Sequence, residues 1–197
     1  MAYIYKTILR YCLRLYEGSD MQFIPYVIRR SNAEKIAVEI IPATQQDLAA
    51  TKGNPPWQTD WESDYLANPN VEKFAMKLPN GELISLGAYQ IAGRKAYVYI
   101  LYLESAPQNN PTMTALGQRE YYGIGEAMIA FGIRYSIDNG CRGVVVFDAK
   151  TDELAWHYAR DFGAKQIPSG ASGGPKRFML ADEDAWNLFS KYLTEEE

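Results

Sequence analysis

The 197-residue sequence has a single histidine, two cysteines and no excess of positive charge, and each shortage narrows the possible functions. One histidine, His157, excludes a histidine-rich metal site, and we expect no bound metal. Cys12 and Cys141 lie far apart, without metal-ligand spacing, and are interpreted as free thiols of an intracellular protein. The net charge of −4 argues against nucleic acid or an anionic membrane as the main partner.

Long hydrophobic runs are also missing, because no segment approaches the roughly 18 consecutive apolar residues of a membrane helix. The N-terminal stretch MAYIYKTILRYCLRLYEGSD has apolar residues at helical spacing. However, Arg10 and Arg14 interrupt them and no small-residue cleavage site follows. We therefore expect a cytoplasmic protein in which residues 1–30 form an amphipathic helical extension of a domain at 31–197.

Beyond this extension, strand and helix patterns alternate in a way typical of a mixed α/β or α+β fold with three layers. Thr44 and Asp47 have the spacing of a helix cap after the first strand. Pro79, Asn80 and Gly81 lie between two apolar runs and predict a hairpin. The expected order is strand 36–40, a helix from 44, a hairpin over 73–91, strand 95–107, helix 124–138, strand 143–149, helix 151–162, strand 176–182 and helix 183–193.

A polar segment at 52–70 contains Trp57 and Trp61. Long ordered loops of this kind are often functional, but the tryptophans could equally fill a hydrophobic edge. The acidic residues Asp60, Glu62 and Asp64 could attract an amine or remain solvated.

The stretch REYYGIGEAMIAFGI places Gly123 and Gly125 directly before a helical pattern. A helix N-terminus presents unpaired backbone N–H groups and a partial positive charge. Glycines there remove Cβ atoms, so a phosphate can approach the main chain closely. The stretch thus has the properties of a pyrophosphate-binding turn, although close packing at a tight turn would require the same glycines.

Two common phosphate-binding motifs do not match this sequence. A dinucleotide-binding fold needs GxGxxG after its first strand, whereas here Met128 replaces the third glycine and the motif comes late in the chain. A GxxxxGK loop followed by Ser or Thr is also absent. The nearest stretch, GASGGPKRF, lacks the glycine before Lys176 and the hydroxyl residue after it.

The order of elements, together with four segments, resembles the GNAT acyltransferase family. The segments are YVYILYLESAP, REYYGIGEAMIAFGI, GCRGVVVFDA and ELAWHYARDFGAKQI. The resemblance implies a three-layer α/β/α fold with splayed central strands, and an acetyl-CoA-dependent N-acetyltransferase that acts on a primary amine without a metal. It also allows a homodimer. The sequence departs from the family's phosphate motif at its first position, where Glu120 stands and Arg119 precedes it.

The resemblance also implies which residues hold coenzyme A. The pantetheine arm would pair with the strand edge at Tyr102–Ala106, where this strand splays from Val144–Asp148. The pyrophosphate would lie on the amides of Tyr122–Glu126. The predicted coenzyme-binding residues are Ser105, Ala106, Arg119, Tyr122, Gly123, Ile124, Gly125 and Glu126.

Two residues are predicted to be catalytic by the same resemblance. Tyr158 would protonate the departing thiolate, although it stands five residues before Gly163 rather than the commoner four. If Tyr158 instead packs between helix and sheet, Tyr121, Tyr122 or water would serve as the acid. Glu104, at the end of a buried strand, would take a proton from the amine, with Asp148 or ordered water as alternatives. The acceptor stays open among antibiotic, polyamine, amino-acid and protein amines. The alternative function is a non-catalytic, coenzyme-binding or protein-interaction member of the fold.

Overall fold

The computed structural model describes residues 21–114, 118–169 and 173–195. The apolar stripe of the predicted N-terminal helix lies outside these residues, and the described part of the 1–30 extension begins with two short strands. Seven strands belong to one mixed sheet, which confirms the predicted α/β class. The described chain divides into two compact units: a first unit of 24–90 and 101–131, and a second unit of 21–23, 91–100 and 132–195.

The first unit is built mainly from antiparallel strands. β4 pairs with β5, and β5 pairs with β6. A smaller sheet has β2 between β3 and β8. The elements with residues in this unit are β2 (Tyr26–Arg29), β3 (Lys35–Ala37), β4 (Glu39–Pro42), α2 (Gln45–Ala50), β5 (Val71–Lys77), β6 (Leu83–Ala92), β7 (Tyr97–Ser105), the 3-10 turn η1 (Pro107–Asn109), β8 (Tyr121–Tyr122) and α3 (Ile124–Asp138).

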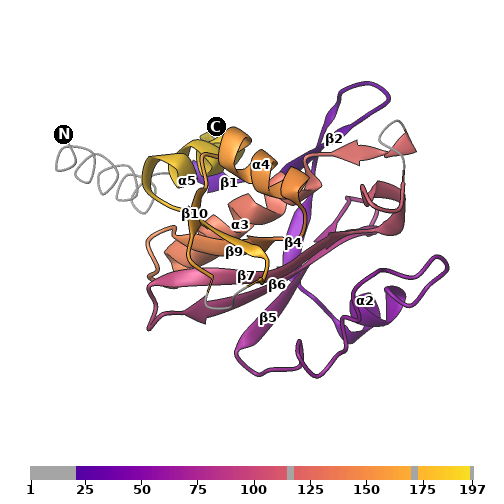
Figure 1. Ribbon diagram of the computed structural model, residues 1–197. Coiled ribbons are helices and arrows are strands. Elements are labelled where there is room, and N and C mark those ends of the chain that lie inside the picture. The colour runs from indigo at the N-terminus through magenta and orange to yellow at the C-terminus, as the bar shows by residue number, and fades with distance from the viewer. Residues whose placement is uncertain (1–20, 115–117, 170–172, 196–197) are drawn as a thin grey trace. The chain divides into compact units, whose positions relative to one another are not determined.

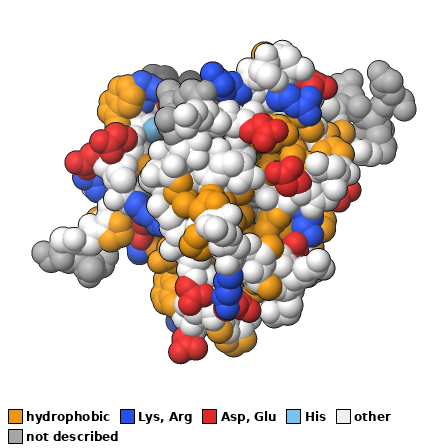
Figure 2. All heavy atoms as spheres, turned by 90° about the vertical axis from the view of Figure 1, so that its right-hand side faces the viewer, with side chains coloured by type: hydrophobic (Ala, Val, Ile, Leu, Met, Phe, Trp, Pro, Cys, Tyr) orange, Lys and Arg blue, Asp and Glu red, His pale blue; other side chains and the backbone are white. Residues whose placement is uncertain are grey.

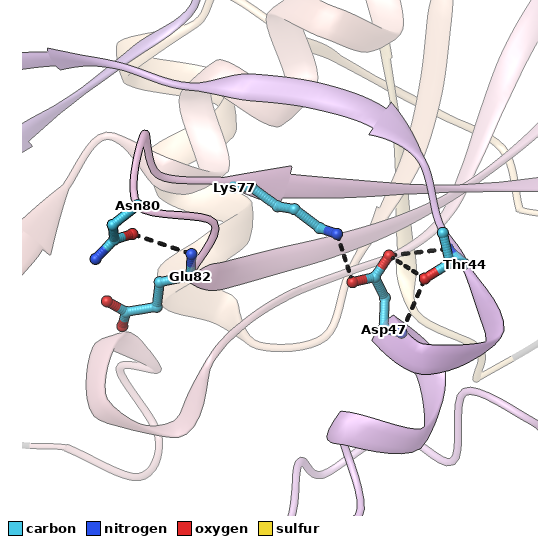
Figure 3. A network of polar contacts seen from close by, with 5 residues as sticks. All are labelled: Thr44, Asp47, Lys77, Asn80 and Glu82. Carbon is cyan, nitrogen blue, oxygen red and sulfur yellow. Dashed lines mark hydrogen bonds and ion pairs between the residues drawn. The ribbon is translucent and has the colours of Figure 1, made fainter.

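Helix α2 follows β4 and leads into the segment 51–70 (Figure 1). Its predicted capping box is confirmed, because Thr44 Oγ1 accepts from the Asp47 amide and the Asp47 carboxylate accepts from the Thr44 amide. Figure 3 shows Lys77 of β5 reaching the same carboxylate, at 2.7 Å. The cap thus fixes a six-residue helix that is too short to be stable from propensity alone.

The predicted hairpin is also confirmed, as β5 and β6. Gly81 has φ +85°, a left-handed conformation that favours glycine, and its amide donates to the Leu78 carbonyl at 2.8 Å. Asn80 accepts from the Glu82 amide at 3.0 Å (Figure 3). These bonds set the register of the two strands.

Trp61 is completely buried. It belongs to a hydrophobic cluster whose other buried members are Leu48, Leu66, Ala75, Leu86 and Ala88. Trp57 packs against the same cluster and is only partly buried. Trp61 therefore fills a hydrophobic core, as the structural interpretation of the 52–70 loop predicts, and does not face a ligand.

The second unit contains parallel and antiparallel pairs. β7 and β9 are parallel, paired from Val98–Val145 to Ile100–Phe147, while β11 pairs antiparallel with both β9 and β10. β1 pairs with β12. The remaining elements of this unit are β1 (Met21–Phe23), β9 (Val145–Ala149), α4 (Asp152–Asp161), β10 (Lys165–Ile167), β11 (Lys176–Leu180), α5 (Asp182–Phe189), the 3-10 turn η3 (Ser190–Tyr192) and β12 (Leu193–Glu195).

Helix α4 begins and ends where the sequence predicts. Thr151 accepts from the Leu154 amide at 3.2 Å and caps the N-terminus. Gly163, just past the C-terminus, has φ +69°, and an added Cβ there would overlap the Asp184 carboxylate. Gly163 therefore both ends the helix and allows α5 to pack closely.

None of the helices in the described part of the chain is long and apolar enough to cross a membrane. On the face shown in Figure 2, hydrophobic side chains gather near the centre, and acidic and basic side chains are interspersed around them.

Candidate functional site

The predicted glycine turn lies in the first unit, between β8 and α3. Gly123 has φ +82°, and an added Cβ at Gly123 or Gly125 would meet no atom within 4 Å. The first hydrogen bond of the helix runs from the Ala127 amide to the Gly123 carbonyl, 2.9 Å away. The preceding amides, at Ile124 and Gly125, therefore have no carbonyl of the helix to bind. The turn is open, and its main chain can be approached closely.

Asn109, which sequence reasoning missed, fixes the segment before this turn. Its side chain is buried, and its Oδ1 accepts from the amides of Glu120 and Tyr121, both at 2.9 Å. β8 pairs with β2 through Tyr122–Ile28 and Tyr121–Arg29. The only signal in the sequence was the polar stretch QNNPT, which does not distinguish a buried amide from a solvated loop.

Arg119 directly precedes the segment that Asn109 holds. Its Nε is buried and has no hydrogen-bond partner among the described residues. A buried, unpaired guanidinium nitrogen is costly unless an anionic group completes it. An open helix N-terminus and an unsatisfied arginine thus occur close together in the sequence, and both fit a pyrophosphate.

The end of β7 carries the other predicted coenzyme contacts. The Ala106 amide already donates to the Ile84 carbonyl at 2.9 Å, and the Glu104 carbonyl accepts from Ser85 Oγ at 2.8 Å. Ser105 is half-buried. A ligand pairing with this strand edge could therefore not use the Ala106 N–H.

The Glu104 carboxylate is buried and fully engaged. It accepts from the Gln58 amide at 2.6 Å, the Thr59 amide at 3.0 Å and the Trp61 indole at 3.2 Å. All three donors belong to the 52–70 loop. The geometry shows Glu104 anchoring this loop, and its role as a base stays a prediction.

Tyr158 belongs to the second unit, on α4, and is half-buried among aromatic rings. Its ring centroid lies 4.8 Å from that of Phe147 and 6.0 Å from that of Phe178. Burial raises the pKa of Tyr158 to about 12. The hydroxyl is therefore protonated at neutral pH. No hydrogen bond joins it to another side chain or carbonyl in the described ranges, so it can donate to a ligand.

Asp148, the alternative base, is held by two partners in the second unit. Arg177 contacts both of its oxygens, at 2.7 and 2.9 Å, and the Tyr99 hydroxyl donates at 2.6 Å. Burial alone would raise the pKa of Asp148, but the hydrogen bonds from Arg177 and Tyr99 outweigh it and lower the pKa. Such an ionised, paired carboxylate is a poor proton acceptor.

Within 21–114, 118–169 and 173–195, no three His, Cys, Asp or Glu side chains cluster in a way that could hold a metal.

Comparison with solved structures identifies the architecture. A mutant of the spermidine N-acetyltransferase SpeG from Vibrio cholerae matches with a TM-score of 0.54 and 14% identity, over 76% of this chain and 96% of that one. The chain has the N-acetyltransferase fold. A chimera of SpeG and hSSAT also gives a TM-score of 0.54, at 12% identity, over 76% and 99% of the two chains.

A dodecameric SpeG from the same organism gives a TM-score of 0.50 at 14% identity, over 81% of this chain and 98% of that one. No protein-family model matches the sequence, and no curated protein does. The resemblance to the GNAT family is thus confirmed at the level of the fold, while the roles of individual residues depend on the geometry described above.

Proposed function

We propose that this protein is an acetyl-CoA-dependent N-acetyltransferase, which transfers an acetyl group to a primary amine by direct attack. The observation that carries the proposal is the open turn at Gly123 and Gly125 within an N-acetyltransferase fold. The amides of Ile124 and Gly125, together with Arg119, would bind the pyrophosphate of the coenzyme. Tyr122 and Glu126 flank these amides, and Ser105 and Ala106 would border the pantetheine arm.

The reaction forms a C–N bond and breaks the C–S bond of the thioester. The amine must first lose a proton, because only its neutral form attacks. Tyr158 supplies a proton to the sulfur as the C–S bond breaks. With a pKa of about 12, above the roughly 8.5 of a thiol, Tyr158 donates effectively only if its hydroxyl lies close to the sulfur at that moment.

Glu104 is the weaker of the two predicted catalytic residues, since three N–H groups already occupy its oxygens. We propose that it positions the 52–70 loop and that water accepts the proton of the amine. Spermidine, the substrate named for the SpeG structures, is a polyamine that the tested amines should include. A cytoplasmic location and a homodimer are parts of the same proposal.

The test is a thiol-release assay with acetyl-CoA and a panel of primary amines, corrected for hydrolysis without amine. We expect at least one amine to release free coenzyme A and to appear as its N-acetyl derivative by mass spectrometry. If coenzyme A binds and no amine in a broad panel is acetylated, the non-catalytic alternative replaces this proposal.

A further inference from the structure

A cavity of about 480 Å³ lies in the first unit, within the size range of small-molecule sites. Ala50, at the end of α2, and Trp57 form one side, and Leu83 of β6 forms another. The segment after β7 forms a third side with Pro107, Gln108 and Met113. Ala106 also lines it, so the cavity borders the strand end where the thioester is expected.

Hydrogen bonds tie two walls of this cavity together. The Gln58 amide is held by Glu104 at 2.6 Å, and Gln58 Oε1 accepts from Thr112 Oγ1 at 2.9 Å. Thr114 Oγ1 donates to the Pro107 carbonyl at 2.7 Å. The loop with Trp57 and the segment with Met113 are therefore fixed relative to each other without a ligand. A preformed cavity loses less conformational freedom on binding.

The cavity lacks charge. None of its described lining residues is Asp, Glu, Lys or Arg. Two acidic residues of the neighbouring loop are engaged elsewhere: Glu62 pairs with Lys52, and Asp60 accepts from the Glu62 amide. Asp64, the third, is exposed and does not line the cavity. Glu82 does not line the cavity, and its carboxylate already accepts from Gln108 Nε2 at 3.2 Å. An ammonium group placed among the lining residues would therefore lose part of its hydration without a carboxylate among them as a partner.

We infer that this cavity binds the acceptor, and that the acceptor is a primary amine on an uncharged, largely apolar body rather than a polyamine. The inference rests on the proposed acetyltransferase function. Trp57, Leu83 and Met113 provide apolar contact area. Gln108 Nε2 donates to Glu82 Oε1 at 3.2 Å, so Gln108 would offer its amide oxygen to a polar substituent. The attacking nitrogen would enter neutral, as the reaction requires, beside Ala106.

Two probes and two matched variants test this inference on the full chain. The probes are 2-phenylethylamine and the triamine spermidine. Ala50→Trp fills the cavity from α2, and Ala49→Trp adds the same side chain at the adjacent exposed position, which does not line it. We expect kcat/KM for 2-phenylethylamine to exceed that for spermidine at least tenfold. Ala50→Trp should raise KM for 2-phenylethylamine at least tenfold, with KM for acetyl-CoA unchanged.

A preference for spermidine, or equal KM values for 2-phenylethylamine in the two variants, would overturn the inference. Calorimetry of 2-phenylethylamine without coenzyme separates it from the proposed function. Binding that is lost in Ala50→Trp and retained in Ala49→Trp supports the cavity even if acetyl-CoA does not bind. Identical binding in both variants contradicts the cavity even if acetyl transfer is observed.

Discussion

The indole N–H of Trp61 donates to the carboxylate of Glu104 across 3.2 Å, and both side chains are almost wholly buried. Glu104→Gln leaves one acceptor oxygen facing three donors, so we expect a loss of about 3 kcal/mol in the free energy of unfolding. Urea denaturation measures it. Glu39→Gln, at an exposed position on β4, should change the stability by less than about 0.5 kcal/mol.

The same variant separates two roles for Glu104. If it positions the 52–70 loop, the folded Glu104→Gln protein should have a higher KM for the amine and an unchanged pH–rate profile. A loss of the acidic limb of that profile, with KM unaffected, would instead identify Glu104 as the base.

Gly123→Ala should weaken acetyl-CoA binding at least tenfold, because its methyl group would enter the open turn. Alanine at φ +82° also costs about 1–2 kcal/mol of stability. Gly81→Ala is the matched control, since Gly81 has φ +85° and equally open surroundings. Urea denaturation should show an equal loss of stability in the two variants. Calorimetry should show weaker acetyl-CoA binding in Gly123→Ala alone. Equal coenzyme affinity in the two would remove Gly123 from the binding site.

Tyr158→Phe should lower kcat at least a hundredfold, in line with the loss of an acid catalyst, while the affinity for acetyl-CoA stays the same. Steady-state kinetics and calorimetry measure the two quantities. An unchanged kcat would assign the proton donor elsewhere.

Tyr158 should also make stability depend on alkaline pH. Its folded pKa of about 12 exceeds the unfolded value of about 10, so its contribution is fully present below pH 10 and is lost between about pH 10 and 12. Wild type should therefore lose roughly 2 kcal/mol more than Tyr158→Phe over that window. Urea denaturation of both proteins from pH 9 to 12 measures this difference. If the free energy of unfolding falls equally in the two proteins, the raised pKa of Tyr158 is contradicted.

Asp47 should contribute stability that disappears in acid. Burial alone would raise its pKa, but hydrogen bonds from Lys77 and Thr44 outweigh it and lower the pKa. The contribution is present above the unfolded value of about 3.9 and lost as the pH falls through the folded value. We expect Asp47→Asn to cost about 1–2 kcal/mol at pH 7 and much less below pH 3. The exposed Asp64→Asn should have little effect at either pH.

The sequence predicted elements whose signals are local. The cap of Thr44 and Asp47, the turn at Gly81 and the end of α4 at Gly163 depend on a few neighbouring residues, and all three are confirmed. The prediction of one continuous strand over 36–40 was wrong, because the structure has two strands there, β3 and β4. Val38 is buried and its amide donates to the Pro25 carbonyl, so the chain changes partner between β3 and β4.

Features set by distant partners were not predictable from the sequence. β1 and β12 have three residues each, and β8 has two, so they exist only through the strands they pair with. Glu104 looked like an isolated acid on a buried strand, because its donors lie more than 40 positions earlier in the chain. Asn109 accepts from amides 11 and 12 positions later in the chain, a contact that no local pattern predicts.

Calorimetric titration of acetyl-CoA into the wild-type protein and Gly125→Trp tests the central claim most directly. The indole would occupy the space before α3 that is open in the wild type, so it should block the coenzyme without unfolding the domain. We predict saturable binding to the wild type at one site per chain, and none to the folded variant. Failure of the folded wild type to bind millimolar acetyl-CoA, or equal binding by the variant, would contradict the claim that this turn holds the coenzyme.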